Sequence, residues 1–168
     1  ASYAFSNPFA KVIGESYKTA ANLQTVDVAY KSAIDSLNDL ASGSLDFAVF
    51  DPTMALAQQK EGRLRILAVT AEERFRPTGD IPTLKEQGID IDLLGWWAAM
   101  VPAKTPDPIA HTINRWFADA LADPETAEFL IRNGADVLVM SAEKANAYLL
   151  EDIKTWARLV EMARIEKQ

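Results

Sequence analysis

The sequence predicts an α/β fold with a mostly parallel sheet, continued by a helical tail. Strand-like and helix-like segments alternate between residues 26 and 70, and crossovers of this kind connect parallel strands. From residue 107 onward, apolar residues recur instead at the three- and four-residue spacing of helices. With 168 residues, the chain is long enough for one ordinary domain or two small lobes.

The alternating part has recognisable start signals. A first helix is expected at Asn7-Pro8, because asparagine caps helices and proline fits their first position. Runs of β-branched and aromatic residues predict strands at residues 26–30, 46–50 and 64–70. Between them we expect helices from Ser32 to Gly43 and from Asp51-Pro52 to about Gly62.

The later part has different start and stop signals. A polar segment leads to a one-turn helix at residues 83–87 with Gly88 as its stop, then to an extended segment at 93–101. Helices are expected to begin at Asp107-Pro108, Asp123-Pro124 and Ser141, with a short strand at 137–139. The first of these helices has an apolar stripe that we expect to be buried, formed by Ile109, Ile113, Trp116, Phe117 and Leu121.

Composition and motifs argue against several classes of protein. The net charge is -7 and basic residues are scattered, which speaks against nucleic-acid binding. Cysteine is absent, and the single histidine, His111, lies off the apolar stripe and is expected to face solvent. No catalytic, nucleotide-binding or metal-binding motif is present. We therefore expect no enzyme activity, no cofactor and no metal.

Three strand-to-helix turns form the candidate site. In a parallel sheet all such turns lie at one edge, and the helices they open present unpaired backbone N–H groups with partial positive charge. Such N-termini can hold a carboxylate without a buried cation. The candidate ligand-binding residues at these turns are Ser6, Asn7, Ser32, Ala33, Asp51 and Thr53.

Two other interpretations remain open at this point. The polar residues could serve only as helix caps. Asp51, whose carboxylate would repel an anionic ligand, could cap its own helix, hold a water, receive an ammonium group or act as the base of a small enzyme.

Several fragments of the chain resemble one family in their order and spacing. They are Val28-Ala29-Tyr30-Lys31, residues 43–51 (GSLDFAVFD), residues 62–70 (GRLRILAVT), Asp80-Ile81-Pro82-Thr83-Leu84, Gly95-Trp96-Trp97, residues 101–106 (VPAKTP), Asp123-Pro124-Glu125 and Trp156. Together they resemble the second lobe of the tripartite tricarboxylate transporter receptors, also called Bug-type extracytoplasmic solute receptors.

The resemblance implies a type II periplasmic binding protein-like fold, in which two α/β lobes close on a small carboxylate, often a dicarboxylate. It implies an organic acid as ligand, subunits of a tripartite tricarboxylate-type membrane transporter as partners, and a periplasmic location. The chain begins with Ala1, so a signal peptide is not part of it. The family's contacts fall, by matching motif, on the same three turns.

The chain also departs from the family pattern. Phe5, Pro8 and Phe9 stand in a turn that is usually rich in Gly and Ser, Ser32 replaces a usual glycine, and Lys104 stands where glycine is frequent. The match begins at the second lobe, which predicts a complete α/β lobe at residues 1–92 and, at 93–168, a crossover strand and helical tail of an incomplete first lobe.

An incomplete lobe would leave the apolar stripes of the tail without cover, so we expect a homo-oligomer or a partner that supplies the missing lobe. An alternative function follows: a truncated receptor-like domain that has lost its ligand and serves as an oligomerising or interaction module. That alternative predicts that Phe5 and Phe9 fill the space between the three turns.

Overall fold

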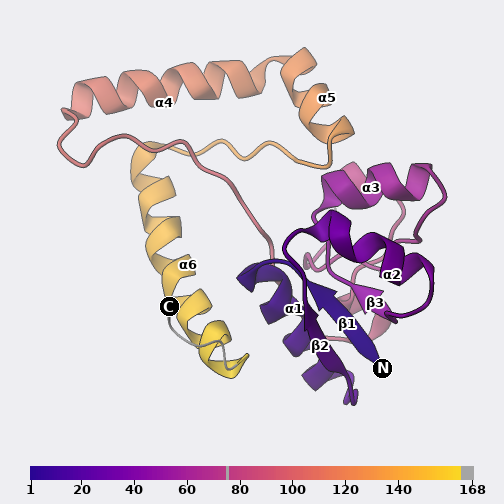
Figure 1. Cartoon of the computed structure of the whole chain (residues 1–168). Coiled ribbons are helices and arrows are strands. Elements are labelled where there is room, and N and C mark those ends of the chain that lie inside the picture. The colour runs from indigo at the N-terminus through magenta and orange to yellow at the C-terminus, as the bar shows by residue number, and fades with distance from the viewer. Residues whose placement is uncertain (75, 164–168) are drawn as a thin grey trace.

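The computed structural model describes residues 1–74 and 76–163. Its sheet has three parallel strands, β1 (Ser2–Phe5), β2 (Val26–Ala29) and β3 (Phe47–Ala48), in the order β2-β1-β3. The sequence thus predicts β2 and β3 correctly, and β1 precedes the predicted turn at Ser6-Asn7. Helices connect and follow the strands (Figure 1): α1 (Pro8–Ala20), α2 (Leu37–Ala41), α3 (Pro52–Lys60), α4 (Asp107–Ala122), α5 (Pro124–Arg132) and α6 (Ala142–Met162), with short 3₁₀ turns η1 (Ala33–Ser36), η2 (Arg76–Thr78) and η3 (Lys85–Gln87).

Side-chain caps begin most of these helices where the sequence predicts. Asn7, Asp51 and Asp123 each accept a hydrogen bond from the backbone N–H three residues on, which satisfies one unpaired donor of the helix. Asp107 is the exception, because it is itself the first residue of α4 and Pro106 precedes it. The one-turn helix η3 ends at Gly88, as predicted, in a left-handed conformation.

Packing of α1 on the sheet depends on a close approach at Gly14. The Tyr3 side chain is fully buried against this glycine, stacks on Phe47 with ring centroids 5.2 Å apart, and donates to Glu15 at 2.8 Å. Burial and the Glu15 hydrogen bond both raise the pKa of Tyr3. A hydrophobic cluster continues from α1 to the segment after η3 and to α6, and its buried members are Val12, Ile13, Ile91, Leu93 and Ala163.

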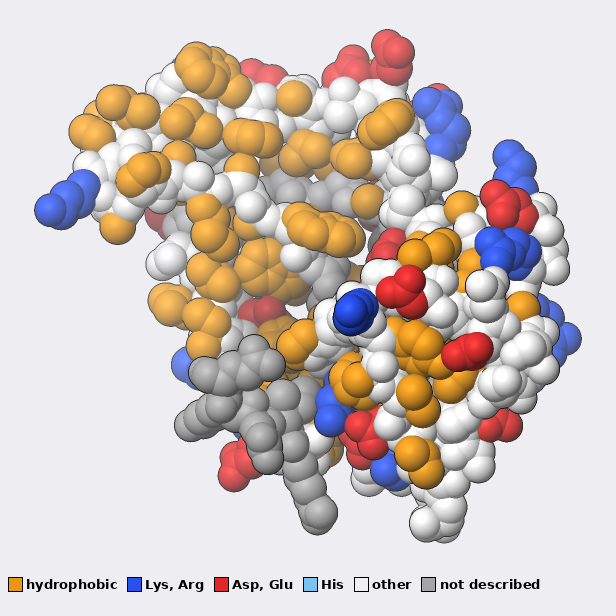
Figure 2. Space-filling model, viewed as in Figure 1, with side chains coloured by type: hydrophobic (Ala, Val, Ile, Leu, Met, Phe, Trp, Pro, Cys, Tyr) orange, Lys and Arg blue, Asp and Glu red, His pale blue; other side chains and the backbone are white. Residues whose placement is uncertain are grey.

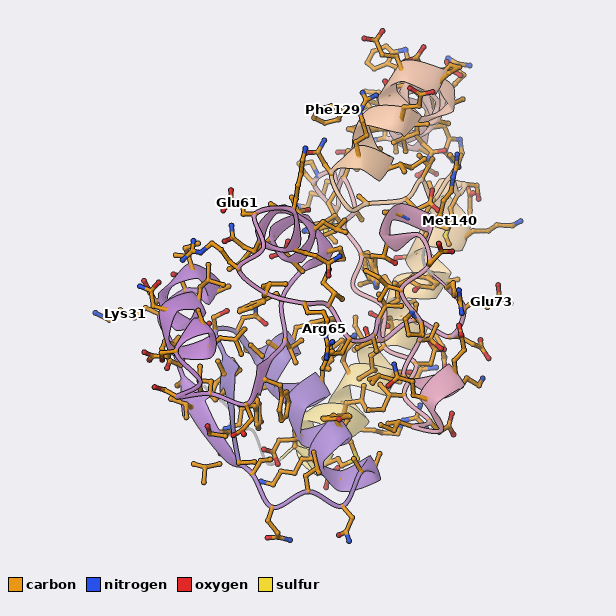
Figure 3. All side chains as sticks on the ribbon, turned by 90° about the vertical axis from the view of Figure 1, so that its right-hand side faces the viewer. Lys31, Glu61, Arg65, Glu73, Phe129 and Met140 are labelled. Carbon is orange, nitrogen blue, oxygen red and sulfur yellow. The ribbon has the colours of Figure 1, made fainter. Side chains whose placement is uncertain are left out.

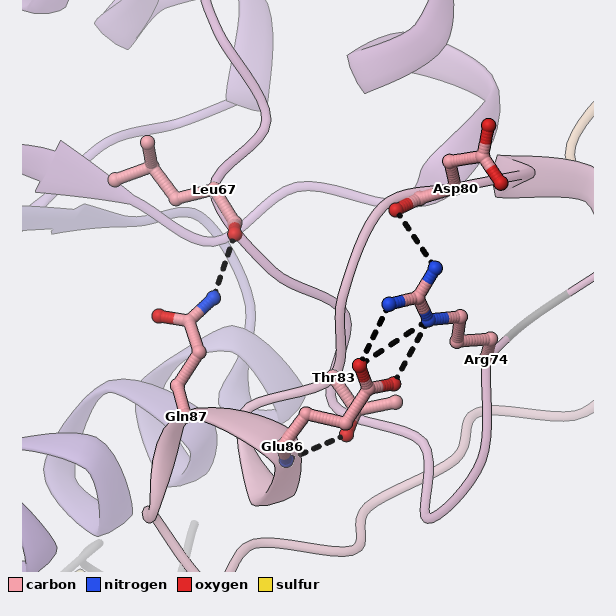
Figure 4. Close-up of polar contacts among 6 residues, drawn as sticks. All are labelled: Leu67, Arg74, Asp80, Thr83, Glu86 and Gln87. Carbon is pink, nitrogen blue, oxygen red and sulfur yellow. Dashed lines mark hydrogen bonds and ion pairs between the residues drawn. The ribbon is translucent and has the colours of Figure 1, made fainter.

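The third predicted strand, at residues 64–70, does not join the sheet. Val69 forms an isolated parallel bridge with Thr83, and the side chain of Gln87 donates to the Leu67 carbonyl at 2.9 Å (Figure 4). Because Pro82 lies beside this bridge and has no N–H, the pairing cannot extend into a regular ladder. In the adjoining loop Arg74 holds Glu86 at 2.8 Å.

Two further expectations are wrong. Residues 137–139 form no strand, since Leu138 and Val139 are exposed and no described strand pairs with them. The helix expected from Ser32 begins as the 3₁₀ turn η1 and becomes α-helical only at Leu37, so α2 has just five residues.

The apolar stripe of α4 is exposed rather than buried. No residue of α4, α5 or α6 is buried, and Trp116 keeps 63% of its surface exposed. Hydrophobic side chains gather along α4 and α6 in Figure 2. The chain exposes 11383 Å² in total, whereas a compact monomer of 18.5 kDa would expose about 8,200 Å². The excess of about 3,000 Å² is several times the roughly 800 Å² that each partner buries in a standard interface.

Candidate functional site

The sheet order brings the three predicted turns to one edge. β1 lies between β2 and β3 and all three strands run parallel, so the segments that follow them leave at their shared carboxyl ends. The connection from β1 leads to β2 on one side of β1, and the connection from β2 leads back across to β3 on the other side. The order of the strands therefore reverses at β1. Ligands of open α/β sheets bind at such switch points.

The first turn has the most open helix N-terminus. Ser6 is half-buried, and Asn7 is exposed with its side chain accepting from the Ala10 amide at 2.8 Å. Pro8 has no N–H, and the Lys11 amide bonds to the Asn7 carbonyl. Of the first amides of this 13-residue helix, the Phe9 amide therefore remains as a donor for a ligand.

Charge near the first turn is already paired. The Lys11 ammonium lies 3.2 Å from Asp27 and 5.0 Å from the centre of the Phe5 ring. Burial raises the pKa of Asp27, but the hydrogen bond from Lys11, a backbone hydrogen bond and the charges of Lys11 and Lys18 together outweigh burial, so the pKa of Asp27 is lowered. A carboxylate at this turn would thus be held by backbone amides and hydroxyls rather than by Lys11.

The two aromatic residues of the first turn have packing partners of their own. Phe9 packs on Trp156, with ring centroids 5.0 Å apart, and lies against Gly95. Phe5 lies next to Lys11 and 6.4 Å from the Tyr3 ring, on the α1 side of the sheet. That Phe5 and Phe9 fill the space between the three turns stays a prediction of the interaction-module interpretation.

The second turn is the weakest anion site of the three. The backbone N–H and the hydroxyl of Ser32 both bond to one carboxylate oxygen of Asp35, at 3.1 and 2.9 Å. The Asp35 carboxylate thus forms one arm of a capping box with Ser32, at the start of η1. Ala33 is half-buried and opens only the short turn η1. The negative charge of Asp35 disfavours a second carboxylate here.

Tyr30, next to the second turn, is also committed to a protein partner. Its hydroxyl donates to Asp39 at 2.6 Å, and this hydrogen bond raises the pKa of Tyr30.

The third turn is joined to the tail. Asp51 is exposed and caps α3 through the Met54 amide at 3.0 Å, which is the capping role left open by the sequence. The Thr53 hydroxyl donates to the Asn133 carbonyl at 2.5 Å, across 80 residues of sequence. The sequence contains no signal for this long-range contact.

Two hollows lie between the segment at 92–96 and α6, and Phe9 of the first turn lines the second of them. Their volumes are about 190 and 240 Å³, and both include Leu94, Asp152 and Trp156. Asp92 lines the first hollow as well, and Trp96 donates to Asp152 at 2.9 Å. Because two carboxylates line this space, it is unsuited to an anionic ligand.

Within residues 1–74 and 76–163, no three potential metal-ligating side chains come together. No helix in that part combines the length and apolar character needed to cross a membrane. His111 is exposed, as predicted, and lies 3.0 Å from Glu143.

The fold is that of the periplasmic binding proteins. The periplasmic binding protein BugD superposes with a TM-score of 0.77 at 28% identity, covering 99% of this chain and 57% of BugD. An R. palustris protein solved with adipate gives a TM-score of 0.85 at 24% identity, covering 96% of this chain and 55% of that one.

The chain belongs to the tripartite tricarboxylate transporter receptor family, whose model matches residues 5–165. A UPF0065 protein of Bordetella bronchiseptica is 28% identical over 156 residues, 93% of this chain and 47% of that protein. The chain thus spans about half the length of these relatives. The family consists of receptors rather than enzymes, which agrees with the expectation from the sequence.

Proposed function

We propose that this chain is the second lobe and helical tail of a receptor that captures a small carboxylate or dicarboxylate for a tripartite tricarboxylate-type transporter. The observation that carries the proposal is the convergence of three strand-to-helix turns at one sheet edge, two of them opening the longer helices α1 and α3. A carboxylate is the ligand that such N-termini favour.

The six predicted residues have unequal roles in this proposal. Ser6 and Asn7 form the principal subsite, because the Phe9 amide is uncommitted there. Asp51 and Thr53 shape the third turn, and their own side chains are engaged by Met54 and Asn133. Ser32 and Ala33 border the ligand from the side of β2. Because the Asp35 carboxylate lies at this turn, only an uncharged part of the ligand is proposed to contact it.

A further part of the receptor would complete the site. The family's location and partners imply that the complete receptor works in the periplasm and meets the membrane subunits of its transporter. In this proposal residues 1–92 form the complete second lobe, and residues 93–168 contribute to the first lobe, which is completed by additional polypeptide. The excess of about 3,000 Å² of exposed surface supports such a cover.

The second candidate function is an oligomerising module without a ligand. It is favoured by the same exposed surface on the tail, with Trp97 81% and Trp116 63% exposed. In this case a second copy of the chain covers α4 and α6.

Native mass spectrometry of the purified chain distinguishes the two functions. The receptor proposal predicts a 1:1 adduct with succinate, malate or adipate and none with succinamide, which has a similar shape but no charge. A dimer that forms no adduct with any of the acids would contradict the receptor proposal and support the module.

A further inference from the structure

The tail reaches the third turn of the candidate site at Asn133–Gly134. Gly134 is buried, although the helices on either side of it contain no buried residue. It lies at the end of α5, next to the first residues of α3. Figure 3 shows the two helices together, with Phe129 marking α5 and Glu61 marking the end of α3.

The contact tolerates no side chain. A Cβ atom on Gly134 would lie 2.7 Å from the Thr53 nitrogen, 2.9 Å from the Pro52 carbonyl carbon and 3.0 Å from the Pro52 Cβ. The first two of these are backbone atoms, which cannot move aside as the end of a flexible side chain can. The neighbouring Asn133 carbonyl accepts the Thr53 hydroxyl.

The turn itself is firmly built. The amide of Gly134 bonds to the Ile131 carbonyl and the amide of Ala135 bonds to the Leu130 carbonyl, which closes the end of α5. The side chain of Asn133 donates to the Phe129 carbonyl at 2.8 Å. The hydrogen-bonded turn at the end of α5 therefore packs directly on the start of α3. A shift of the turn would shift the start of α3 with it.

We infer that the Asn133–Gly134 turn is a positioning element of the third ligand turn, which it fastens to the tail by packing Gly134 on the Thr53 backbone. The inference rests on the proposed function, since it makes the geometry of one ligand turn depend on the tail. Movement of the tail, such as occurs when two lobes close, would then displace the backbone at Asp51–Thr53.

Gly134→Ala tests the contact, and Gly88→Ala is its matched control. Both glycines follow helical segments and have left-handed φ angles, +80° and +84°, so alanine meets the same backbone strain at either position. Only Gly134 has atoms within 4 Å of the added Cβ, because Gly88 faces open space. The difference between the two variants therefore isolates the packing against α3.

Spin-label distances report the contact without any ligand. The chain contains no cysteine, so Glu61→Cys and Glu125→Cys place unique labels on exposed sites beside α3 and in α5. We expect one narrow distance distribution in the parent and in Gly88→Ala, and a broader one with a longer mean in Gly134→Ala. Identical distributions in all three proteins would overturn the inference.

A ligand measurement separates this inference from the proposed function. With adipate as probe, we expect Gly134→Ala to bind at least tenfold more weakly than Gly88→Ala. If both variants bind alike, the turn does not position the site. If the parent chain itself binds no acid, the proposed function fails, while the label distances still decide whether Gly134 fastens the tail.

Discussion

Asn7→Asp is expected to weaken carboxylate binding at least tenfold while leaving the chain folded. Aspartate caps helices as well as asparagine does, so the hydrogen bond to the Ala10 amide and α1 itself are retained. The added charge lies at the helix start where the ligand is proposed to bind. Two like charges about 4 Å apart near a protein surface repel by about 4 kcal/mol. A tenfold loss of affinity corresponds to only about 1.4 kcal/mol, which leaves room for screening of this repulsion by solvent and salt.

The measurement is a calorimetric titration with adipate, accompanied by urea unfolding of each variant. Asn22→Asp is the matched control, because it makes the same change of net charge at the opposite end of α1. A 13-residue helix separates the two positions by about 20 Å. Equal weakening by both variants would show that total charge matters and that the first turn is not the site.

Gly14→Ala is expected to lower the free energy of unfolding by up to about 2 kcal/mol net, because overpacking a core costs about 1–3 kcal/mol. The added Cβ would lie 2.1 Å from Cε2 of Tyr3. Tyr3 cannot move aside cheaply, because its side chain is fully buried and stacked on Phe47. This loss opposes the gain of about 1 kcal/mol that alanine brings to a helix interior.

Urea unfolding of Gly14→Ala beside Thr19→Ala separates the two effects. Thr19 is exposed on the same helix, so its replacement by alanine changes helix propensity without adding volume to the core. Thr19→Ala should be as stable as the parent or slightly more stable. If Gly14→Ala is stabilised to the same extent, the contact between α1 and Tyr3 is not tight.

Local signals in the sequence predict the helices well, for reasons visible at their ends. Asn7, Asp51, Asp123 and Ser141 cap helices through hydrogen bonds to residues three positions on, which depend only on neighbouring residues. Hydrophobic runs likewise predict β2 and β3. Parallel crossovers then place the three turns at one edge, so the location of the candidate site follows from the sequence as well.

Long-range packing explains what the sequence does not predict. The run at 64–70 has the composition of a strand, but its pairing depends on Pro82, Thr83 and Gln87, which follow at least a dozen residues later. Phe9 likewise packs on Trp156, 147 positions further along the chain, and no pattern near Phe9 predicts this partner. Such contacts depend on which surfaces meet in three dimensions, and the spacing of apolar residues along the sequence does not predict them.

The central claim is that a carboxylate binds at the edge formed by the three turns. Titration of the isotopically labelled chain with adipate, followed through its backbone amide resonances, tests this most directly. The account predicts saturable shifts led by Phe9 and Ala10 at the start of α1 and extending to Thr53 and Met54 of α3, with none for succinamide. Shifts confined to residues 92–96 and α6, which line the two hollows, without shifts at Thr53 and Met54, or no shifts at all, would contradict it.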